Sequence, residues 1–441
     1  MSLNRGPMAS LLYNLSLFFG ICGYSGYLIG QRIFLGKHKK KLWQSFYRLF
    51  TIKLPKTTSL KPTIWMHGVS VGEVRASFPV VEKIRSTYPT FSFVISTVTV
   101  TGQEEARKIF PDAEDHFILP TDFSWAMKKL VARIDPIILI LSETDFWYHL
   151  LSEIKRKGAK IVIINGKISP SSLKKFTRAA FFAHKLFSLP DLFLVQSEIY
   201  QSAFRQLGVS AEKVHVTGNL KMTPSSTGIK KEDQMQLRNT FSLTNHDFVI
   251  TIASTHDKEE EILLRQLLPS WKKYPHLKII LAPRHLERLP QVRQIIQQLQ
   301  LSYVLYSSQK EHEKAVQVIV IDCMGMVCTL YQISNLAIVG GSYISTIGGH
   351  NIFEPIQVGT PVIYGPYMYG QQSLENKVQW SGAGKTVPAE DLSEFVENYI
   401  EDPQISLQMQ KGAKNLSEEM ERPLINTWKH LEPLLLQSSC K

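Results

Sequence analysis

Short apolar or β-branched runs alternate with amphipathic stretches of helical spacing along most of the chain, and this alternation limits the possible folds most strongly. It begins at Thr63 and is typical of a parallel sheet covered by helices on both faces. A polar segment at 223–246 interrupts the alternation, which restarts at Phe248. The sequence therefore predicts an α/β chain with two doubly wound, Rossmann-like domains at 61–222 and 247–441, joined by a linker.

The predicted strands of the first domain are 63–69, 91–98, 116–119, 136–141, 160–164, 191–195 and 214–217. Those of the second domain are 248–253, 278–282, 303–306, 318–321, 336–339 and 361–363. After these strands, the sequence predicts that residues 391–436 are helical, with a break at Pro403 and no further strand.

The positive charge of the chain is concentrated at its start. The chain has 50 Lys and Arg against 38 Asp and Glu, and residues 1–72 hold ten of the basic residues and none of the acidic ones. The rest is nearly neutral and has no basic stripe of the kind that binds nucleic acid, so no nucleic-acid partner is expected. The four cysteines have neither zinc-site spacing nor a disulfide pattern.

The longest uncharged run lies in this basic region, between Arg5 and Arg32. A helix over 6–31 would be about 39 Å long, more than the roughly 30 Å hydrocarbon core of a bilayer. The lysines at 37–41 favour the cytoplasmic side. We therefore expect residues 1–60 to form a membrane anchor with a basic juxtamembrane segment. An interfacial helix is the alternative for 6–31, and the segment 42–50 suits either a membrane surface or a domain edge.

In the first domain, polar turns follow predicted strands, where ligands of doubly wound sheets bind. The segment HGVSVGE ends at Glu73, SETDFW contains Glu143, and GNLK ends at Lys221. Glu73 could act as a general base, although a carboxylate in a first helical turn also stabilises the helix dipole. The Ser before Glu143 equally suits a helix N-cap, and a lone Lys is usually solvated surface, so spacing alone leaves the roles open.

In the second domain, four further turns follow strands: APRH at 282–285, DCMGMV at 322–327, GGSYISTIGGHNIFEP at 340–355 and YGPYMYGQQ at 364–372. The glycines are costly in entropy unless the backbone adopts a positive φ or approaches a ligand closely. A phosphate could bind the amides at the helix start, with Arg284 beside it and Glu354 on a ribose diol. The turns predict a nucleotide site, and the lack of a DxD sequence argues against a metal-dependent sugar-nucleotide enzyme.

In their order along the chain, HGVSVGE, SETDFW, GNLK, APRH, DCMG, GGHNIFEP and GP resemble the motifs of the 3-deoxy-D-manno-octulosonic acid (Kdo) transferases of Gram-negative bacteria. The resemblance implies a GT-B architecture, with two domains facing a cleft and a final helix that crosses back onto the first domain. It also implies inverting transfer from CMP-Kdo to a lipid A precursor on the cytoplasmic face of the inner membrane, with no metal or other cofactor.

Carried over by position, the resemblance makes Glu73 the proton acceptor and makes Glu143 and Lys221 supports of the transition state. The residues implied to contact CMP are Pro283, Arg284, Gly325, Met326, Val327, Asn351, Ile352, Phe353 and Glu354. Met326 stands where the family usually has Glu, which leaves mainly backbone contacts there, and Tyr367 replaces the usual His. The alternatives are another GT-B enzyme, such as a hexosyltransferase or an epimerase, and a non-catalytic membrane-tethered ligand-binding protein.

Overall fold

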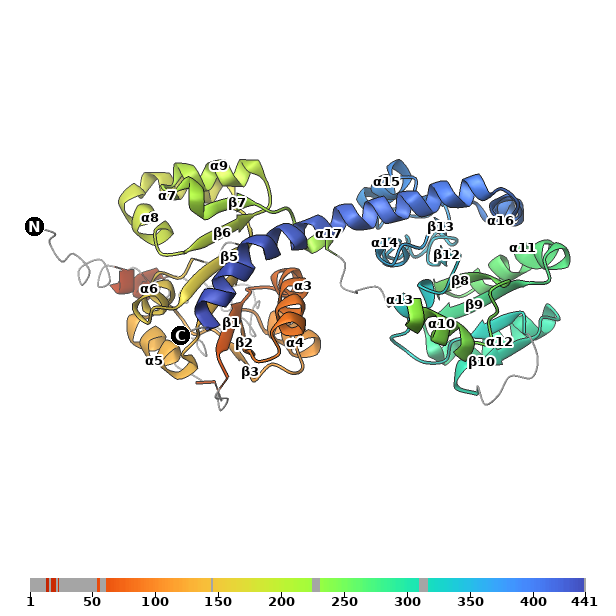
Figure 1. Cartoon of the computed structure of the whole chain (residues 1–441), viewed down its shortest axis with the longest axis horizontal. Coiled ribbons are helices and arrows are strands. Elements are labelled where there is room, and N and C mark those ends of the chain that lie inside the picture. Colours follow the sequence, from red (N-terminus) through yellow and green to blue (C-terminus); the bar gives the residue numbers. More distant parts are fainter. Residues whose placement is uncertain are drawn as a thin grey trace, which may run out of the picture. The chain divides into compact units, whose positions relative to one another are not determined.

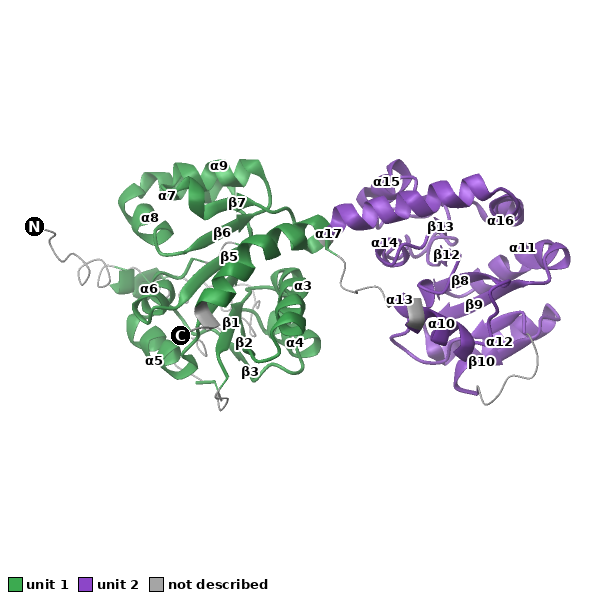
Figure 2. Ribbon diagram, viewed as in Figure 1, with its two compact units in different colours: residues 1–223, 422–441 green, residues 224–421 purple. Residues whose placement is uncertain are grey.

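The computed structural model describes residues 13–15, 17–20, 23, 54–55, 61–143, 146–223, 231–308 and 316–439. The chain forms two compact units (Figure 2). Unit 1 comprises Met1–Thr223 and Arg422–Lys441, and unit 2 comprises Pro224–Glu421. Each unit contains one parallel sheet of seven strands, which confirms the predicted α/β class.

The strand order of the sheet in unit 1 is β3-β2-β1-β4-β5-β6-β7. Its strands are β1 (Thr63–His67), β2 (Ser92–Thr97), β3 (Asp115–Ile118), β4 (Ile138–Ser142), β5 (Lys160–Gly166), β6 (Leu192–Val195) and β7 (Val214–Val216). The helices are α3 (Val71–Thr87), α4 (Val100–Ile109), α5 (Ser124–Ile134), α6 (Tyr148–Arg156), α7 (Pro170–Arg178), α8 (Ala180–Phe187), α9 (Glu198–Gln206) and the short η1 (Ala211–Lys213) and η2 (Leu220–Met222).

Helices cover both faces of this sheet (Figure 1). In β4 every residue is buried, and successive side chains enter opposite cores. Leu139 and Leu141 pack with α5 and α6, whereas Ile138 and Ile140 pack with α3. A continuous apolar run is what a parallel strand requires when both of its faces are covered.

The strand order of the sheet in unit 2 is β10-β11-β9-β8-β12-β13-β14. Its strands are β8 (Phe248–Thr255), β9 (Leu277–Pro283), β10 (Tyr303–Leu305), β11 (Val318–Val320), β12 (Leu336–Val339), β13 (Val362–Tyr364) and β14 (Gly384–Thr386). The helices are α10 (Lys231–Thr240), α11 (Glu259–Lys273), α12 (Leu289–Gln298), α13 (Val327–Tyr331), α14 (Phe353–Gln357), α15 (Gln372–Trp380), α16 (Leu392–Glu401) and α17 (Pro403–Ser439), with the short η3 (Leu286–Arg288), η4 (Tyr306–Ser308) and η5 (Ala389–Asp391).

The long helix α17 begins in unit 2 and ends in unit 1. In its last part Leu431 and Leu435 are fully buried in the core that contains α3, and Trp428 packs against the same core. Tyr88 stacks on Trp428 at 6.2 Å between ring centroids. The domain bounds from the sequence assigned this tail to the second domain, whereas the family resemblance implied that its final helix crosses back onto the first. The structure divides it, because an apolar stripe on the last turns completes the core of unit 1.

None of the helices within the described ranges combines the length and apolarity needed to cross a bilayer. Most of the predicted anchor at 6–31 and all of the segment 42–50 lie outside the described residues. Within the anchor, Tyr13 is helical and stacks on Phe182 of α8 at 5.7 Å between centroids. Asn14 donates from Nδ2 to Ser124 Oγ at 3.1 Å. This part of the amino-terminal segment therefore packs on unit 1.

Candidate functional site

Two neighbouring strands in the middle of the unit 1 sheet, β1 and β4, have connections that leave in opposite directions. At such a switch point the loops at the carboxyl ends of the strands separate and leave room for a ligand. Glu73 lies in the first turn of α3, after β1, and Glu143 directly follows β4. The Ser142 hydroxyl donates to the Glu73 carbonyl oxygen at 3.2 Å, so the two predicted motifs are adjacent.

The Glu73 carboxylate faces the turn that starts α3 and is partly exposed. Its Oε2 accepts from the Val69 N–H at 2.7 Å, and its Oε1 accepts from the Ser70 hydroxyl at 3.2 Å. This geometry stabilises the carboxylate and the helix start together. A Cβ added to Gly72 would lie 3.5 Å from Lys221 Nζ, so the Lys221 ammonium approaches the same turn.

Glu143 is almost completely buried between two lysines. The Nζ atoms of Lys167 and Lys221 each lie 2.6 Å from one of its carboxylate oxygens, and the Asn165 side-chain amide donates to it at 3.3 Å. Both Glu143 and Asn165 have positive φ, at 66° and 54°. A non-glycine residue in this region is uncommon, and such strain is often stored at functional sites. The group of Lys167, Glu143 and Lys221 carries a net charge of about +1.

The structure thus brings the three predicted residues Glu73, Glu143 and Lys221 together at one sheet edge. Sequence reasoning missed Lys167 and Asn165, which lie after and within β5. Lys167 directly follows a strand, as Glu143 does, so the same rule could have found it. Thr144 and Asp145 of the SETDFW motif lie outside the described residues.

Unit 2 has the same kind of switch point between β8 and β12. Arg284 follows β9, and its backbone N–H donates to the Thr255 carbonyl at 3.1 Å. After β12 the glycine-rich loop leads to Asn351, whose side-chain oxygen accepts from the Phe353 N–H at 3.1 Å and so starts α14. Burial raises the pKa of Glu354 in the first turn of α14, and the Asn351 amide and the Arg284 charge oppose this increase.

The predicted CMP-contacting residues divide into three groups by exposure. Arg284, Gly325 and Asn351 are exposed. Pro283, Ile352 and Phe353 are buried. The third group, Met326, Val327 and Glu354, is partly exposed. Met326 directly precedes α13, Val327 begins it, and Glu354 lies on α14, which contacts α13.

Sequence reasoning also missed His256, which follows β8. Its Nε2 lies 2.7 Å from Nε2 of His350, and the two rings stack with centroids 5.0 Å apart. His285 meets His256 edge-on at 5.4 Å. Among the described residues, no group of three or more His, Cys, Asp and Glu side chains has an arrangement that could hold a metal ion.

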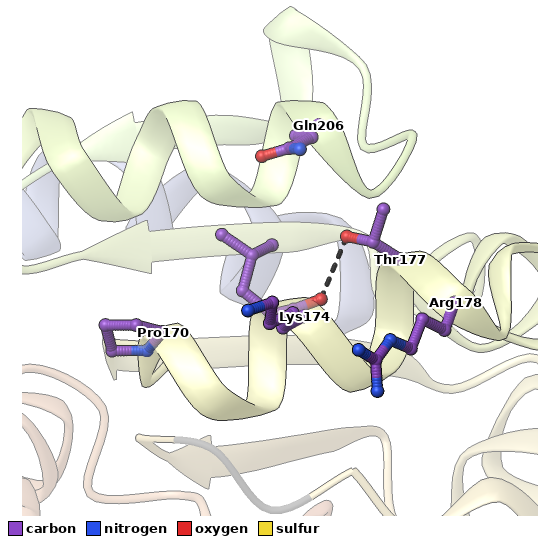
Figure 3. A pocket seen from close by; sticks show the side chains of 6 residues that line it. Pro170, Lys174, Thr177, Arg178 and Gln206 are labelled. Atoms are coloured by element: carbon purple, nitrogen blue, oxygen red, sulfur yellow. Dashed lines mark hydrogen bonds between the residues drawn. The ribbon is translucent and has the colours of Figure 1, made fainter.

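A pocket of about 360 Å³ lies on unit 1 between α7 and the end of α9 (Figure 3). Its lining residues are Pro170, Leu173, Lys174, Thr177, Arg178 and Gln206. Lys174 and Arg178 lie one helical turn apart, and the Thr177 hydroxyl donates to the Leu173 carbonyl at 2.9 Å. Neither cation forms an ion pair with any residue in the described ranges.

The pocket belongs to a long segment without acidic residues. Residues 154–190 contain nine Lys and Arg and no Asp or Glu. Outside α7, most of these cations pair with acids from elsewhere in unit 1, as Lys155 does with Asp191 at 2.6 Å and Lys157 does with Asp135 at 2.9 Å. The cations of α7 are therefore available for an anionic ligand.

Comparison with known proteins gives a consistent result. Residues 41–223 match the family model described as 3-deoxy-D-manno-octulosonic-acid transferase (kdotransferase). A 3-deoxy-D-manno-octulosonic acid transferase of Chlamydophila psittaci is 33% identical over 417 residues, which cover 94% of each chain. That of Haemophilus influenzae is 31% identical over 309 residues, which cover 69% of this chain and 71% of the relative.

Among solved structures, the chain matches the C-terminal CMP-Kdo binding domain of WaaA from Acinetobacter baumannii. The match has 30% sequence identity and a TM-score of 0.40, and it covers 42% of this chain and 96% of that domain.

Proposed function

The chain belongs to the family of 3-deoxy-D-manno-octulosonic acid (Kdo) transferases, which are glycosyltransferases, and on this premise we propose that it transfers Kdo from CMP-Kdo to a lipid A precursor. The observation that carries the proposal is the convergence of Glu73, Glu143 and Lys221 at the switch point of unit 1. The proposal includes the GT-B architecture that the motifs imply.

Glu73 acts as the general base. A sugar hydroxyl is a poor nucleophile at neutral pH, so a carboxylate has to accept its proton as the new bond forms. The acceptor oxygen bonds to the anomeric carbon of Kdo, the bond from that carbon to the phosphate oxygen of CMP breaks, and the hydroxyl proton passes to Glu73. The transition state resembles an oxocarbenium ion, and attack from the face opposite CMP inverts the configuration.

Lys221 and Lys167 support this step. Kdo carries a carboxylate, and its approach to Glu73 would bring two negative charges together. The ammonium groups beside Glu143 reduce this repulsion, and the ion pairs with the buried Glu143 carboxylate fix their positions before the substrate binds.

Unit 2 binds the donor. Arg284 binds the phosphate, the backbone at 325–327 and 351–353 contacts the nucleotide, and Glu354 accepts from the ribose diol. CMP leaves as a dianion, and fixed cations with helix-start amides stabilise it, so the proposed reaction needs no metal.

The acceptor is a phosphorylated lipid, and the cations of α7 bind one of its phosphates in the pocket of Figure 3.

The segment 6–31 anchors the protein in the inner membrane, with the catalytic units on the cytoplasmic face. The packing of Tyr13 on Phe182 supports a close association of this segment with unit 1.

Incubation of the purified full chain with CMP-Kdo and a tetra-acylated, bis-phosphorylated glucosamine disaccharide tests the proposal. We expect a lipid product with added Kdo by mass spectrometry and an equal amount of released CMP. Parallel incubations with UDP-hexoses test the hexosyltransferase and epimerase alternatives. Conversion of a UDP-sugar with no Kdo product would reject the proposal, and binding of CMP-Kdo without turnover would favour a ligand-binding protein.

A further inference from the structure

A group of basic side chains meets at the switch point of the unit 2 sheet. His256 comes from the turn after β8, His285 follows β9, and His350 lies in the loop after β12. The stacked rings of His256 and His350 are joined through their Nε2 atoms at 2.7 Å, which requires one ring to donate and the other to accept. Their Nδ1 atoms are not needed for this bond. We call His256 and His350 the histidine pair.

The backbone around the histidine pair is unusually constrained. Ser254 and Lys258 on either side of His256 have φ of 61° and 73°. The fully buried carboxylate of Glu259 accepts from the backbone N–H groups of His256, Gly341 and Tyr343 at 2.7 to 2.9 Å. One carboxylate therefore joins the turn after β8 to the loop after β12, and strained backbone persists only where the surroundings fix it in this way.

Glycines allow the two segments to approach this closely. A Cβ on Gly340 would lie 2.7 Å from the Thr255 Cα, and a Cβ on Gly341, whose φ is 71°, would lie 2.7 Å from the His350 ring. Any other residue at Gly341 would therefore displace the imidazole. This explains why the loop contains glycines directly after β12.

The two arginines near the histidine pair differ in their ion pairs. Arg288 is neutralised by Glu260 at 2.8 Å and Asp257 at 3.1 Å. Arg284, in contrast, has no carboxylate within 4.0 Å in the part of the chain that the structure describes. The acids nearest the pair are already engaged, because Glu259 accepts the three backbone N–H groups and Glu260 accepts from Thr255 and Arg288.

The environment keeps both imidazoles neutral in the absence of a ligand. Burial, together with the neighbouring His256, Arg284 and His285, lowers the pKa of His350 to about 4. Burial also lowers the pKa of His256, as do His285, Arg288 and Arg284, while Glu260 raises it. An anion placed beside Arg284 would offset this positive field.

We propose that the histidine pair and Arg284 form a proton-linked site for the phosphate of the donor, in which binding of the phosphate is accompanied by uptake of a proton on an Nδ1 atom of the pair. This inference rests on the proposed function and extends it by assigning His256 and His350, which donate to the anion once protonated. A singly protonated pair keeps its Nε2 hydrogen bond, because only double protonation removes the acceptor.

The direction of the pH effect follows from linkage. A ligand that raises the pKa of a group is bound more tightly when the group is protonated, so affinity falls as pH rises. With one proton taken up for each ligand, affinity falls by up to about tenfold for each pH unit above the pKa of the ligand-free pair.

Calorimetric titration of CMP into the full chain in buffers of different ionisation enthalpy tests the inference. We expect the wild-type protein to take up more protons on binding CMP between pH 6 and 7 than the variants His256→Gln and His350→Gln do. The variants should also bind CMP with a flatter pH dependence. His246→Gln, at an exposed histidine of the same unit, should behave as wild type. Cytidine, which lacks the phosphate, should bind with no proton uptake by the pair.

Proton uptake by His350→Gln equal to that of wild type would overturn the inference while leaving the proposed function intact. A wild-type protein that does not bind CMP would overturn both. If a variant fails to fold, the imidazole ¹⁵N resonances of the wild-type protein provide the same test. Protonation of one ring on addition of CMP supports the site, and two neutral rings in the complex reject it.

Discussion

At the scale of single residues, Lys167 is the clearest addition to the predicted site. It contacts Glu143 as closely as Lys221 does, although no family motif pointed to it. Lys167→Met removes one ammonium group from the site and leaves Lys221 paired with the buried carboxylate. We expect kcat for Kdo transfer to fall by about 100-fold, the loss typical when one preorganised electrostatic group is removed.

Lys157→Met is the matched control, since Lys157 also pairs with an acid in unit 1, but at the surface. It should retain wild-type activity. A Lys167→Met enzyme with the same kcat as this control would show that Lys167 only stabilises the fold.

A second residue, Asp122, predicts how the stability of unit 1 depends on pH. Its fully buried carboxylate accepts from the backbone N–H groups of His149 and Leu150, both at 2.9 Å, and from Tyr13. Burial raises its pKa to about 7. Between about pH 4 and 7 the folded state therefore keeps a proton that the unfolded state has released, so stability falls as pH rises through this range.

Asp122→Asn removes this titration. We expect the melting temperature of the wild-type protein to fall more between pH 5 and pH 8 than that of the variant. The full effect of such a shift in pKa is on the order of 4 kcal/mol. Parallel melting curves at the two pH values would contradict the assignment of a raised pKa to Asp122.

At the scale of elements, α7 has neither a buried residue nor an acid. Its cations lie on the pocket without an ion pair among the described residues, so they are free to bind an anion. The double variant Lys174→Gln/Arg178→Gln should raise KM for the bis-phosphorylated acceptor about tenfold and leave KM for CMP-Kdo unchanged.

Lys128→Gln/Lys129→Gln on α5 is the matched control for the loss of two charges from a surface helix. An acceptor that lacks one phosphate distinguishes binding of that phosphate from general attraction to the lipid surface. If the α7 cations bind that phosphate, its removal abolishes the difference in KM between the α7 variant and the wild type. General attraction would leave the difference in place. Equal KM values for the α7 variant and the wild type with every acceptor would reject the pocket as an acceptor site.

At the scale of the whole molecule, the sequence predicted the two parallel sheets well, because their strands contain continuous apolar runs such as 138–141 in β4. It missed β14, since Gly384–Thr386 is too short to show a pattern. Strand order was also beyond the sequence. His256 and His350 are 94 residues apart and meet only because β8 pairs with β12.

For the candidate site as well, the sequence showed the residues that lie in local motifs and missed those whose partners come from other strands. Glu73, Glu143 and Lys221 were predicted because each lies in a recognisable motif that follows a strand. Lys167 and His256 had no motif, and their importance depends on partners from other strands. The return of α17 to unit 1 likewise depends on packing around Trp428 and Leu431, which a helical period alone does not assign to either domain.

In the proposed mechanism, Glu73 accepts the proton of the acceptor hydroxyl during transfer of Kdo from CMP-Kdo. A single-turnover measurement with Glu73→Gln and CMP-Kdo, read as Kdo transfer to the lipid acceptor, tests it most directly. We predict transfer slowed by about 10² to 10⁴-fold with CMP affinity unchanged, because the amide cannot accept the proton. Transfer by Glu73→Gln at the wild-type rate would contradict the account.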